Sequence, residues 1–245
     1  MTSYFARYQA GEHNEVWRDL RALDLTVFEV RHREDAQAVA REMAVRARWN
    51  VETLVDRLQA DGFVAAENDD DGTPRPAHFP PSDGASALAD WMEEAFAPFP
   101  MTVAAWIRQV GDVWLVGEHP RWAQSVLANP LVVEFEHTLY GGGSREYFEG
   151  EWKSWGESPH RDSRPFQLDF APDALHKANI SGDGPYGIVL AGSGVDGRLG
   201  PSTWFVDDLN AAFAAGGFPG ALYSEGYVDP PQGLREGLAR DLLRL

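Results

Sequence analysis

Apolar residues at helical spacing dominate the first part of the chain. Residues 12–24, 34–48 and 50–62 each place apolar side chains on one face of a helix. Asn50 has the residue type of a helix N-cap, and Asp61-Gly62 stops the third pattern. The spacing therefore predicts an all-helical module over residues 1–66, in which the last two helices can join into one longer bent helix.

Residues 67–84 interrupt this pattern. An acidic run, Glu67 to Gly72, is followed by four prolines before residue 82. Acidic and proline-rich stretches without apolar periodicity are typical of linkers and surface loops. We therefore expect a linker or long loop between the helical module and a second domain over residues 85–245.

The period of the apolar pattern changes from 3.6 to 2 near residue 110. Helices are predicted over 85–96, 101–109, 203–215 and 234–245, and short strands over 113–116, 131–135, 166–170 and 186–190. The order favours an α+β fold: an N-terminal helical module followed by a mixed, largely antiparallel sheet packed with helices. We expect one sheet of about four to six strands, close to the usual sheet size.

Charge and composition narrow the classes of partner. The 245-residue chain has 38 acidic and 21 basic residues, a net charge of −17, and no cysteine. Such a chain is repelled by nucleic acids and anionic membranes and suits a basic protein partner. Without cysteine there is no thiol nucleophile, disulfide or thiolate metal site. The N-terminus resembles no signal peptide and no apolar run approaches 18 residues, so we expect a cytoplasmic protein.

A glycine-rich motif, Gly192 to Gly197, spells G-x-G-x-x-G directly after an apolar run. A dinucleotide site needs a helix that starts at the last glycines, and Pro201 opposes a helix there. The acidic partner of the ribose, expected about 20 residues on, is missing near Gly217. We therefore expect a polar connection before the helix at 203–215, and no nicotinamide, flavin or other cofactor.

Two small groups of residues could serve acid–base chemistry. Strand alternation puts Glu134 and Glu136 on one face, with His137 beside them, and Asp173 precedes His176 by one helical turn. The pattern rules favour a polar outer face of an edge strand for the first group and a capped helical turn for the second. No histidines are spaced as metal ligands, so we expect no metal site.

Acidic and aromatic residues alternate after the loop 141–144. The segment contains Glu146, Tyr147, Phe148, Glu149, Glu151, Trp152 and Trp155. Aromatic side chains anchor protein interfaces, and carboxylates attract a basic partner but repel nucleic acid. We predict that this segment binds a protein partner; the alternative is a loop held on the sheet by its own aromatic side chains.

Part of the chain resembles the SUKH superfamily. The resemblance lies in Phe99-Pro100-Met101-Thr102-Val103, Trp106-Ile107 and Val110-Gly111, followed by the strand-like residues 113–117. Asp207-Asp208-Leu209 is similar to the family's C-terminal helix. The likeness extends over roughly residues 85–220, and the N-terminal helical module lies outside it.

The superfamily includes yeast cell-wall synthesis regulators and many bacterial immunity proteins of polymorphic toxin systems. The resemblance implies an α+β fold, no enzymatic activity and a role in binding a partner protein. The leading hypothesis is therefore a non-enzymatic module that neutralises a nuclease-type bacterial toxin. The alternative is a small hydrolase or transferase that uses the carboxylates and histidines named above.

Overall fold

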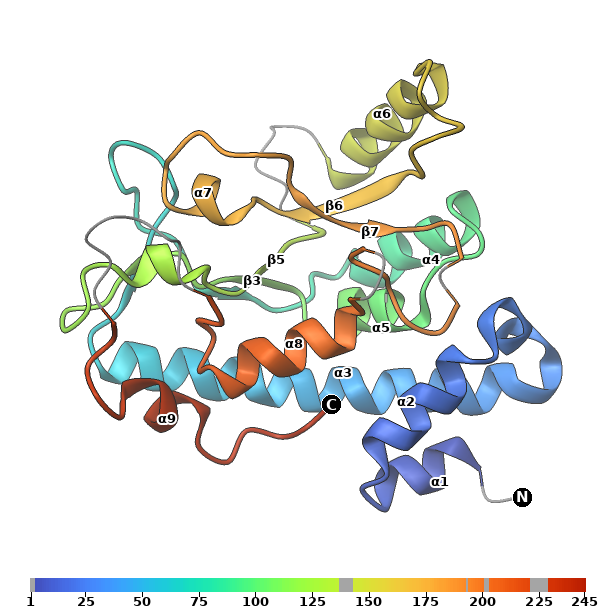
Figure 1. Cartoon of the computed structure of the whole chain (residues 1–245), viewed down its shortest axis with the longest axis horizontal. Helices are drawn as coiled ribbons and strands as arrows, with labels where there is room; N and C mark the ends of the chain where they lie inside the picture. Colours follow the sequence, from blue (N-terminus) through green and yellow to red (C-terminus); the bar gives the residue numbers. More distant parts are fainter. Residues whose placement is uncertain (1–2, 137–142, 193, 201–202, 221–228) are drawn as a thin grey trace.

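The N-terminal residues form four helical segments. A computed structural model describes residues 3–136, 143–192, 194–200, 203–220 and 229–245. Its first elements are α1 (Tyr4–Gln9), α2 (His13–Arg21), the 3₁₀ helix η1 (Asp24–Phe28) and α3 (Val30–Ala60). The predicted helices 34–48 and 50–62 are joined in α3, which runs almost the full length of the molecule (Figure 1).

The first two helices fold back on α3. The Asp35 carboxylate of α3 accepts hydrogen bonds from the backbone of Tyr4 and Phe5, 2.6 and 3.0 Å away. These are free N–H groups of the first turn of α1, which have no partner within their own helix. Tyr8 and Trp17 are buried between the helices. The helical module is thus held by tertiary contacts as well as by its own periodicity.

Helices α4 (Ala85–Ala95) and α5 (Met101–Gln109) begin the second part of the chain. The helix α5 packs on α3, and seven of its nine residues are buried. Gly111 then makes a tight turn at φ +83°, and an added Cβ would lie 2.2 Å from the Phe79 carbonyl oxygen. Only glycine combines this φ with such a close backbone approach.

The strands form small antiparallel sheets packed against helices, which confirms the α+β class. The pairs are β1 (Val64–Ala65) with β4 (Gly117–Glu118), β2 (His78–Phe79) with β3 (Asp112–Trp114), β3 with β5 (Val132–Val133), and β6 (Gln167–Ala171) with β7 (Tyr186–Val189). The strand β2 lies inside the segment 67–84. The division of the chain into module, linker and domain stays a prediction.

The prediction of one sheet with four to six strands is wrong for the described residues. After β5 the Asp112 carboxylate accepts from the backbone of Phe135 and Glu136, which takes the place of strand pairing. Directly after β5, the Glu134 N–H donates to the Phe170 carbonyl of β6 at 2.8 Å. Side-chain competition for backbone donors therefore divides the sheet that the alternating pattern suggested.

The segment after residue 143 forms α6 (Ser144–Glu157), which stands out from the body of the molecule (Figure 1). The strand β6 follows, then the short helix α7 (Ala174–Lys177) and β7. The described part of the loop before α6 is Gly143, its N-cap, while Gly141 and Gly142 lie outside the described residues.

A short 3₁₀ helix, η2 (Ser125–Ala128), precedes β5. The C-terminal region contains the helices α8 (Phe205–Ala214) and α9 (Leu234–Ala239). The predicted helix over 234–245 is wrong beyond Ala239. The tail lies along α3 instead, where the Asn50 side chain donates to the Leu243 carbonyl and accepts from its N–H. Arg57 donates to the carbonyls of Leu238 and Arg240.

One continuous hydrophobic core joins the helices and sheets. Its largest fully buried side chains include Trp106 of α5 and Trp114 of β3. None of the helices in the described ranges is both long and apolar enough to cross a lipid bilayer.

Candidate functional site

An aromatic cluster fixes the inner face of α6. The Trp152 ring lies 4.8 Å from Phe166 and 5.4 Å from Phe96, measured between ring centroids. Trp155 donates its indole N–H to the Arg164 carbonyl at 2.7 Å. Phe148 is 1% exposed and faces the core, whereas Trp152 stays 40% exposed. The aromatic residues therefore hold α6 in place, and Trp152 also stays partly accessible to solvent.

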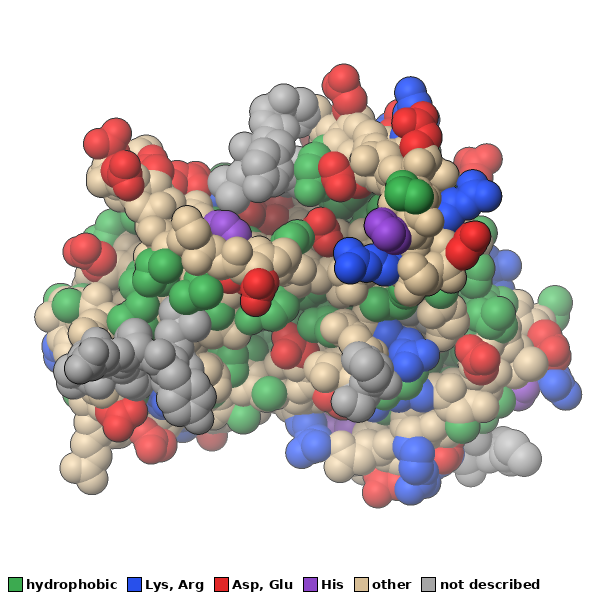
Figure 2. All heavy atoms as spheres, turned by 45° about the horizontal axis from the view of Figure 1, so that its top comes forward, with side chains coloured by type: hydrophobic (Ala, Val, Ile, Leu, Met, Phe, Trp, Pro, Cys, Tyr) green, Lys and Arg blue, Asp and Glu red, His purple; other side chains and the backbone are tan. Residues whose placement is uncertain are grey.

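The opposite face of α6 is charged. Glu146 and Glu149 lie on it and are exposed. Glu151 is exposed as well but lies beside the inner face, near Asp169, and Tyr147 is half-buried. Figure 2 shows carboxylates over the upper part of the molecule around α6, with basic side chains between them. Arg145 pairs with Glu149 at 2.8 Å across one helical turn. The predicted partner-binding residues thus lie on two faces of one helix, and their role in binding stays a prediction.

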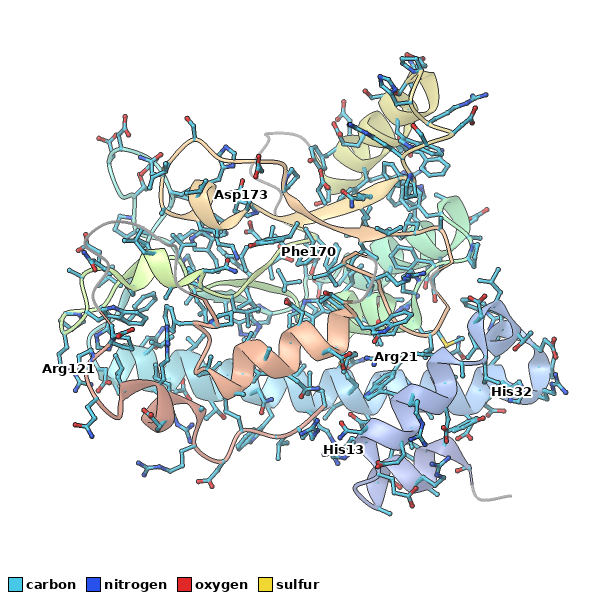
Figure 3. All side chains as sticks on the ribbon, viewed as in Figure 1. His13, Arg21, His32, Arg121, Phe170 and Asp173 are labelled. Carbon is cyan, nitrogen blue, oxygen red and sulfur yellow. The ribbon has the colours of Figure 1, made fainter. Side chains whose placement is uncertain are left out.

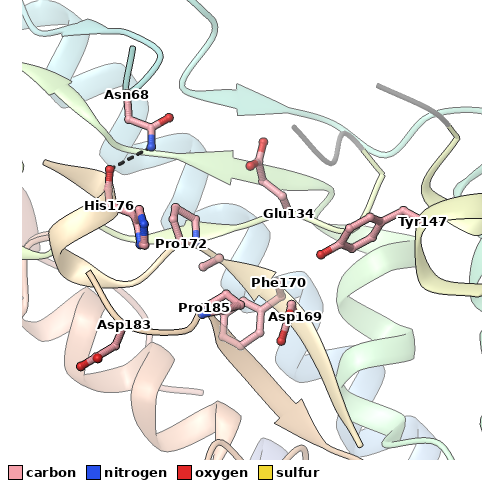
Figure 4. Close-up of a pocket in the computed structure, with 10 residues that line it drawn as sticks. Asn68, Glu134, Tyr147, Asp169, Phe170, Pro172, His176, Asp183 and Pro185 are labelled. Atoms are coloured by element: carbon pink, nitrogen blue, oxygen red, sulfur yellow. Dashed lines mark hydrogen bonds between the residues drawn. The ribbon is translucent and has the colours of Figure 1, made fainter. Parts of the chain in front are cut away.

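A cavity of about 170 Å³ lies between the N-terminal end of α6, the strand β6 and the helix α7 (Figure 4). Polar groups from distant parts of the chain line it: Asn68, Glu134, Tyr147, Asp169, His176 and Asp183. Phe170, Ala171, Pro172 and Pro185 complete the walls. The cavity joins one member of each predicted acid–base group, Glu134 and His176, with one residue of the acidic aromatic segment, Tyr147.

Glu134 is the most deeply buried carboxylate of this cavity. Its side chain is 5% exposed, and the Arg75 guanidinium donates to Oε1 at 2.7 Å. Burial raises the pKa of Glu134 to about 7, although the positive charge of Arg75 opposes the shift. The interpretation of this position as the polar outer face of an edge strand is therefore wrong, because Arg75 and the chain around it cover the strand end.

Asp169 lies on β6 and is half-buried in the cavity wall. Burial, with a smaller contribution from the nearby Glu151 carboxylate, raises the pKa of Asp169 to about 6. Within the described ranges, no residue makes a hydrogen bond or ion pair with the Asp169 side chain. Its strand partner is Gly187, where an added Cβ would lie 2.8 Å from Asp169 Oδ1.

Asp173 and His176 form the predicted capped turn. The Asp173 carboxylate accepts from the backbone of Leu175 at 2.8 Å and of His176 at 3.3 Å, and so caps α7. It also accepts from Nδ1 of His176, whose side chain is 47% exposed. These contacts hold the pKa of Asp173 below its usual range, against the opposing effect of burial. The pair fixes the ring of His176, so that Nε2 carries the lone pair when the ring is neutral.

The acidic loop after residue 66 closes one side of the cavity. Asn68 donates to the His176 carbonyl at 2.8 Å, and Asn179 donates to Asp70 at the same distance. Asp69 accepts from both the backbone and the hydroxyl of Thr73. The bonds of Asn68 and Asp70 hold the loop against α7 and the residue Asn179 that follows it, and the Asp69–Thr73 bonds fix the shape of the loop itself.

Glu136 does not line the cavity with Glu134. Its carboxylate accepts from the backbone and the hydroxyl of Ser82. His137 lies outside the described residues. Glu134 and Glu136 therefore have different surroundings, and no three acidic or histidine side chains of the described ranges could hold a metal ion.

The glycine motif contacts the N-terminal helices. Asp196 is fully buried, accepts from Thr102 Oγ1 at 3.1 Å and pairs with Arg21. Arg21 lies on α2, where Figure 3 labels it. At Gly194 an added Cβ would lie 2.7 Å from the Asp24 carbonyl oxygen. The next helix, α8, begins at Phe205, as expected from Pro201. The glycines here allow close packing between segments; Ser193 and Pro201 lie outside the described residues.

Sequence reasoning missed several residues of the cavity. The sequence did contain a signal for Asp169, because the alternation of apolar and polar residues in 166–170 places it on the more polar face of its strand. Asn68 and Asp183 lie in loops, and nothing local indicates that they meet β6. Arg75 follows the acidic run, and its pairing with Glu134 depends on contacts across the fold.

Comparison with known proteins gave no match to any protein-family model, to any curated protein or to any solved structure. The resemblance to the SUKH superfamily therefore stays an expectation from the sequence.

Proposed function

We propose that this protein is a non-enzymatic module that binds a basic protein partner through the exposed face of α6. The partner class suggested by the sequence is a nuclease-type toxin domain, which the module would neutralise as an immunity protein. The expected cytoplasmic location belongs to the same proposal. An acidic protein attracts such a partner over long distances and speeds their association.

The observation that carries this proposal is the position of α6. Its inner face is fixed by Phe148 and Trp155, so the helix presents Glu146, Glu149 and Glu151 at defined places without further ordering. A preorganised charged surface loses little conformational entropy on binding. The partly exposed Trp152 gives this surface an aromatic anchor beside the carboxylates.

A capture experiment with matched variants tests the proposal. The bait is the wild-type chain, a variant with Glu146→Gln, Glu149→Gln and Glu151→Gln, and a control with Glu15→Gln, Glu34→Gln and Asp56→Asn. All six acids are exposed, and each triple variant loses the same charge. We expect wild type and control to retain one basic protein from the native cell, and the α6 variant to lose it. No captured protein, or equal capture by all three baits, would contradict the proposal.

A second candidate, a small hydrolase or transferase, has one observation in its favour. Glu134 and His176 line the same cavity. A carboxyl group with a pKa of about 7 can donate a proton near neutral pH, and a histidine oriented by Asp173 can accept one from water. This arrangement fits general acid–base catalysis without a covalent intermediate.

The catalytic alternative is tested with activated esters and phosphate esters. Under this alternative, wild type hydrolyses at least one p-nitrophenyl ester, and both His176→Ala and Glu134→Gln lose that activity. His160→Ala is the control, because His160 is exposed and lies outside the cavity lining. Activity that persists in His176→Ala, or the absence of any hydrolysis above background, would count against an enzyme.

A further inference from the structure

The cavity at the N-terminal end of α6 has a size and a lining that suit one side chain of a partner protein. We propose that it binds a guanidinium group, and that its occupant is an arginine side chain of the basic partner. This inference rests on the proposed function and adds to it the residue type that the partner must supply. The acids that receive the guanidinium are Asp169 and Glu134.

Asp169 provides the first carboxylate. It is half-buried, and its charge has no counter-ion or hydrogen-bond donor among the residues of the described ranges. An ionised carboxylate is costly to bury unless a cation or donors pair with it. A guanidinium in the cavity would supply both a positive charge and donors.

Glu134 provides the second acceptor. Its side chain is 5% exposed, and Arg75 donates to Oε1. No residue in the described ranges donates to the other oxygen, Oε2. The backbone bond from Glu134 to Phe170 holds the end of β5 beside β6, so Glu134 and Asp169 line the same cavity (Figure 4).

The apolar walls favour a guanidinium over an ammonium group. Tyr147 and Phe170 contribute rings to the lining, and Pro172 and Pro185 contribute flat apolar surfaces. A guanidinium is planar, weakly hydrated and able to stack on aromatic faces, whereas an ammonium group holds its water strongly. Two separate carboxylates also match the several donors of one guanidinium.

The size of the cavity suits an arginine side chain. Its volume is about 170 Å³. Pockets for drug-sized ligands and cofactors occupy about 300–1,000 Å³. The cavity therefore has room for one guanidinium-bearing side chain, and the exposed face of α6 at the rim can contact the chain that carries the arginine.

The test uses N-acetyl-arginine N-methylamide as the probe, followed by ¹H–¹⁵N NMR on the full chain. We expect saturable shifts centred on residues 134, 169 and 170. The citrulline analogue, which has the same shape without the charge, should produce no saturable shifts. The lysine analogue should bind more weakly than the arginine analogue. Asp169→Asn should weaken arginine binding about tenfold or more, the effect of a lost charge-assisted bond, and Asp56→Asn should not change it.

A measurement on the wild type does not depend on any variant. The ¹³C shift of the Asp169 carboxyl carbon reports its pKa, and the arginine probe should lower that pKa because a cation favours the ionised form. Equal binding of citrulline or lysine, an unchanged Asp169 pKa, or full affinity in Asp169→Asn would overturn the inference. If the α6 face still captures a basic protein in those cases, only the pocket assignment fails and the proposed function stands.

Discussion

The Arg21 guanidinium lies 2.7 Å from the carboxylate of Asp196, a residue 175 positions further along the chain. Asp196 is fully buried, and Arg21 also donates to Asp207 on α8 at 3.0 Å. Trp204 stacks on the guanidinium, with its ring centroid 5.0 Å from Cζ. One arginine of α2 therefore connects the N-terminal helices with the glycine motif and with α8.

Removal of Arg21 should strongly destabilise the fold. In Arg21→Ala the buried Asp196 charge loses its partner, a change that costs about 3–5 kcal/mol in comparable buried pairs. Urea denaturation measures the effect. Arg18→Ala is the control, because the Arg18 side chain is 71% exposed and should change stability by less than about 1 kcal/mol. Equal stability of the two variants would show that the Asp196 pair does not hold the helices.

The glycine motif should act in packing and not in nucleotide binding. Gly194→Ala should destabilise the fold by about 1–3 kcal/mol, since its Cβ would approach the Asp24 carbonyl to 2.7 Å. Calorimetry with nicotinamide and flavin dinucleotides should give no binding heat to the wild type. Micromolar binding that disappears in Gly194→Ala would contradict this account of the motif.

Asp169→Asn should stabilise the protein at alkaline pH. The folded-state pKa of about 6 lies above the usual value of about 3.9, so the folded chain binds more protons than the unfolded chain between these two pH values. Stability from this group therefore falls as pH rises from about 4 to 6, and the penalty stays above pH 6.

The melting temperature measures this penalty. Because Asp169 is partly exposed, solvent screening reduces the gain in Asp169→Asn to on the order of 1 kcal/mol at pH 8. At pH 4 wild type and variant should melt at nearly the same temperature. Asp183→Asn is the control, because Asp183 is exposed in the same cavity lining and should have little effect at either pH. A lower melting temperature for Asp169→Asn at pH 8 would refute the assignment of Asp169 as a carboxylate without a partner.

The variants Trp152→Ala and Glu149→Gln should change different quantities: the first changes stability and dissociation, and the second changes association. Trp152 contacts Phe96, Trp155 and Phe166, so its truncation should cost about 2 kcal/mol of stability and speed dissociation of a partner. Glu149→Gln loses an exposed pair with Arg145 worth at most about 0.5 kcal/mol. It should leave stability nearly unchanged and slow association. Stopped-flow kinetics with the captured partner, together with thermal melts, separates the two effects.

Helices with a strong apolar stripe along one face were predictable from the sequence. The predicted ranges 85–96, 101–109 and 203–215 each contain one observed helix with nearly the same bounds. The helix α6 was not predicted as such, because Gly150 and Gly156 lower its intrinsic helix propensity. Its aromatic side chains, packed on Phe96 and Phe166, supply the stability that local propensity lacks.

Tertiary contacts explain the other differences from the sequence predictions. Asn50 has the residue type of a cap, yet it lies inside α3 and bonds the backbone of Leu243. That bond also keeps the tail extended where its pattern predicted a helix. At the candidate site, Asp173 and His176 were predictable because they interact over one turn. The approach of Glu134 to Arg75 and Asp169 depends on long-range topology that no local pattern contains.

The proposed function requires that the acidic face of α6 bind a basic protein. The most direct measurement is the association rate constant of the captured partner as a function of salt concentration, for wild type, the α6 triple glutamine variant and the matched control variant. We expect a rate that falls steeply with salt for wild type and control, and a slower rate with a weaker salt dependence for the α6 variant. The same rate and salt dependence in all three proteins would contradict it.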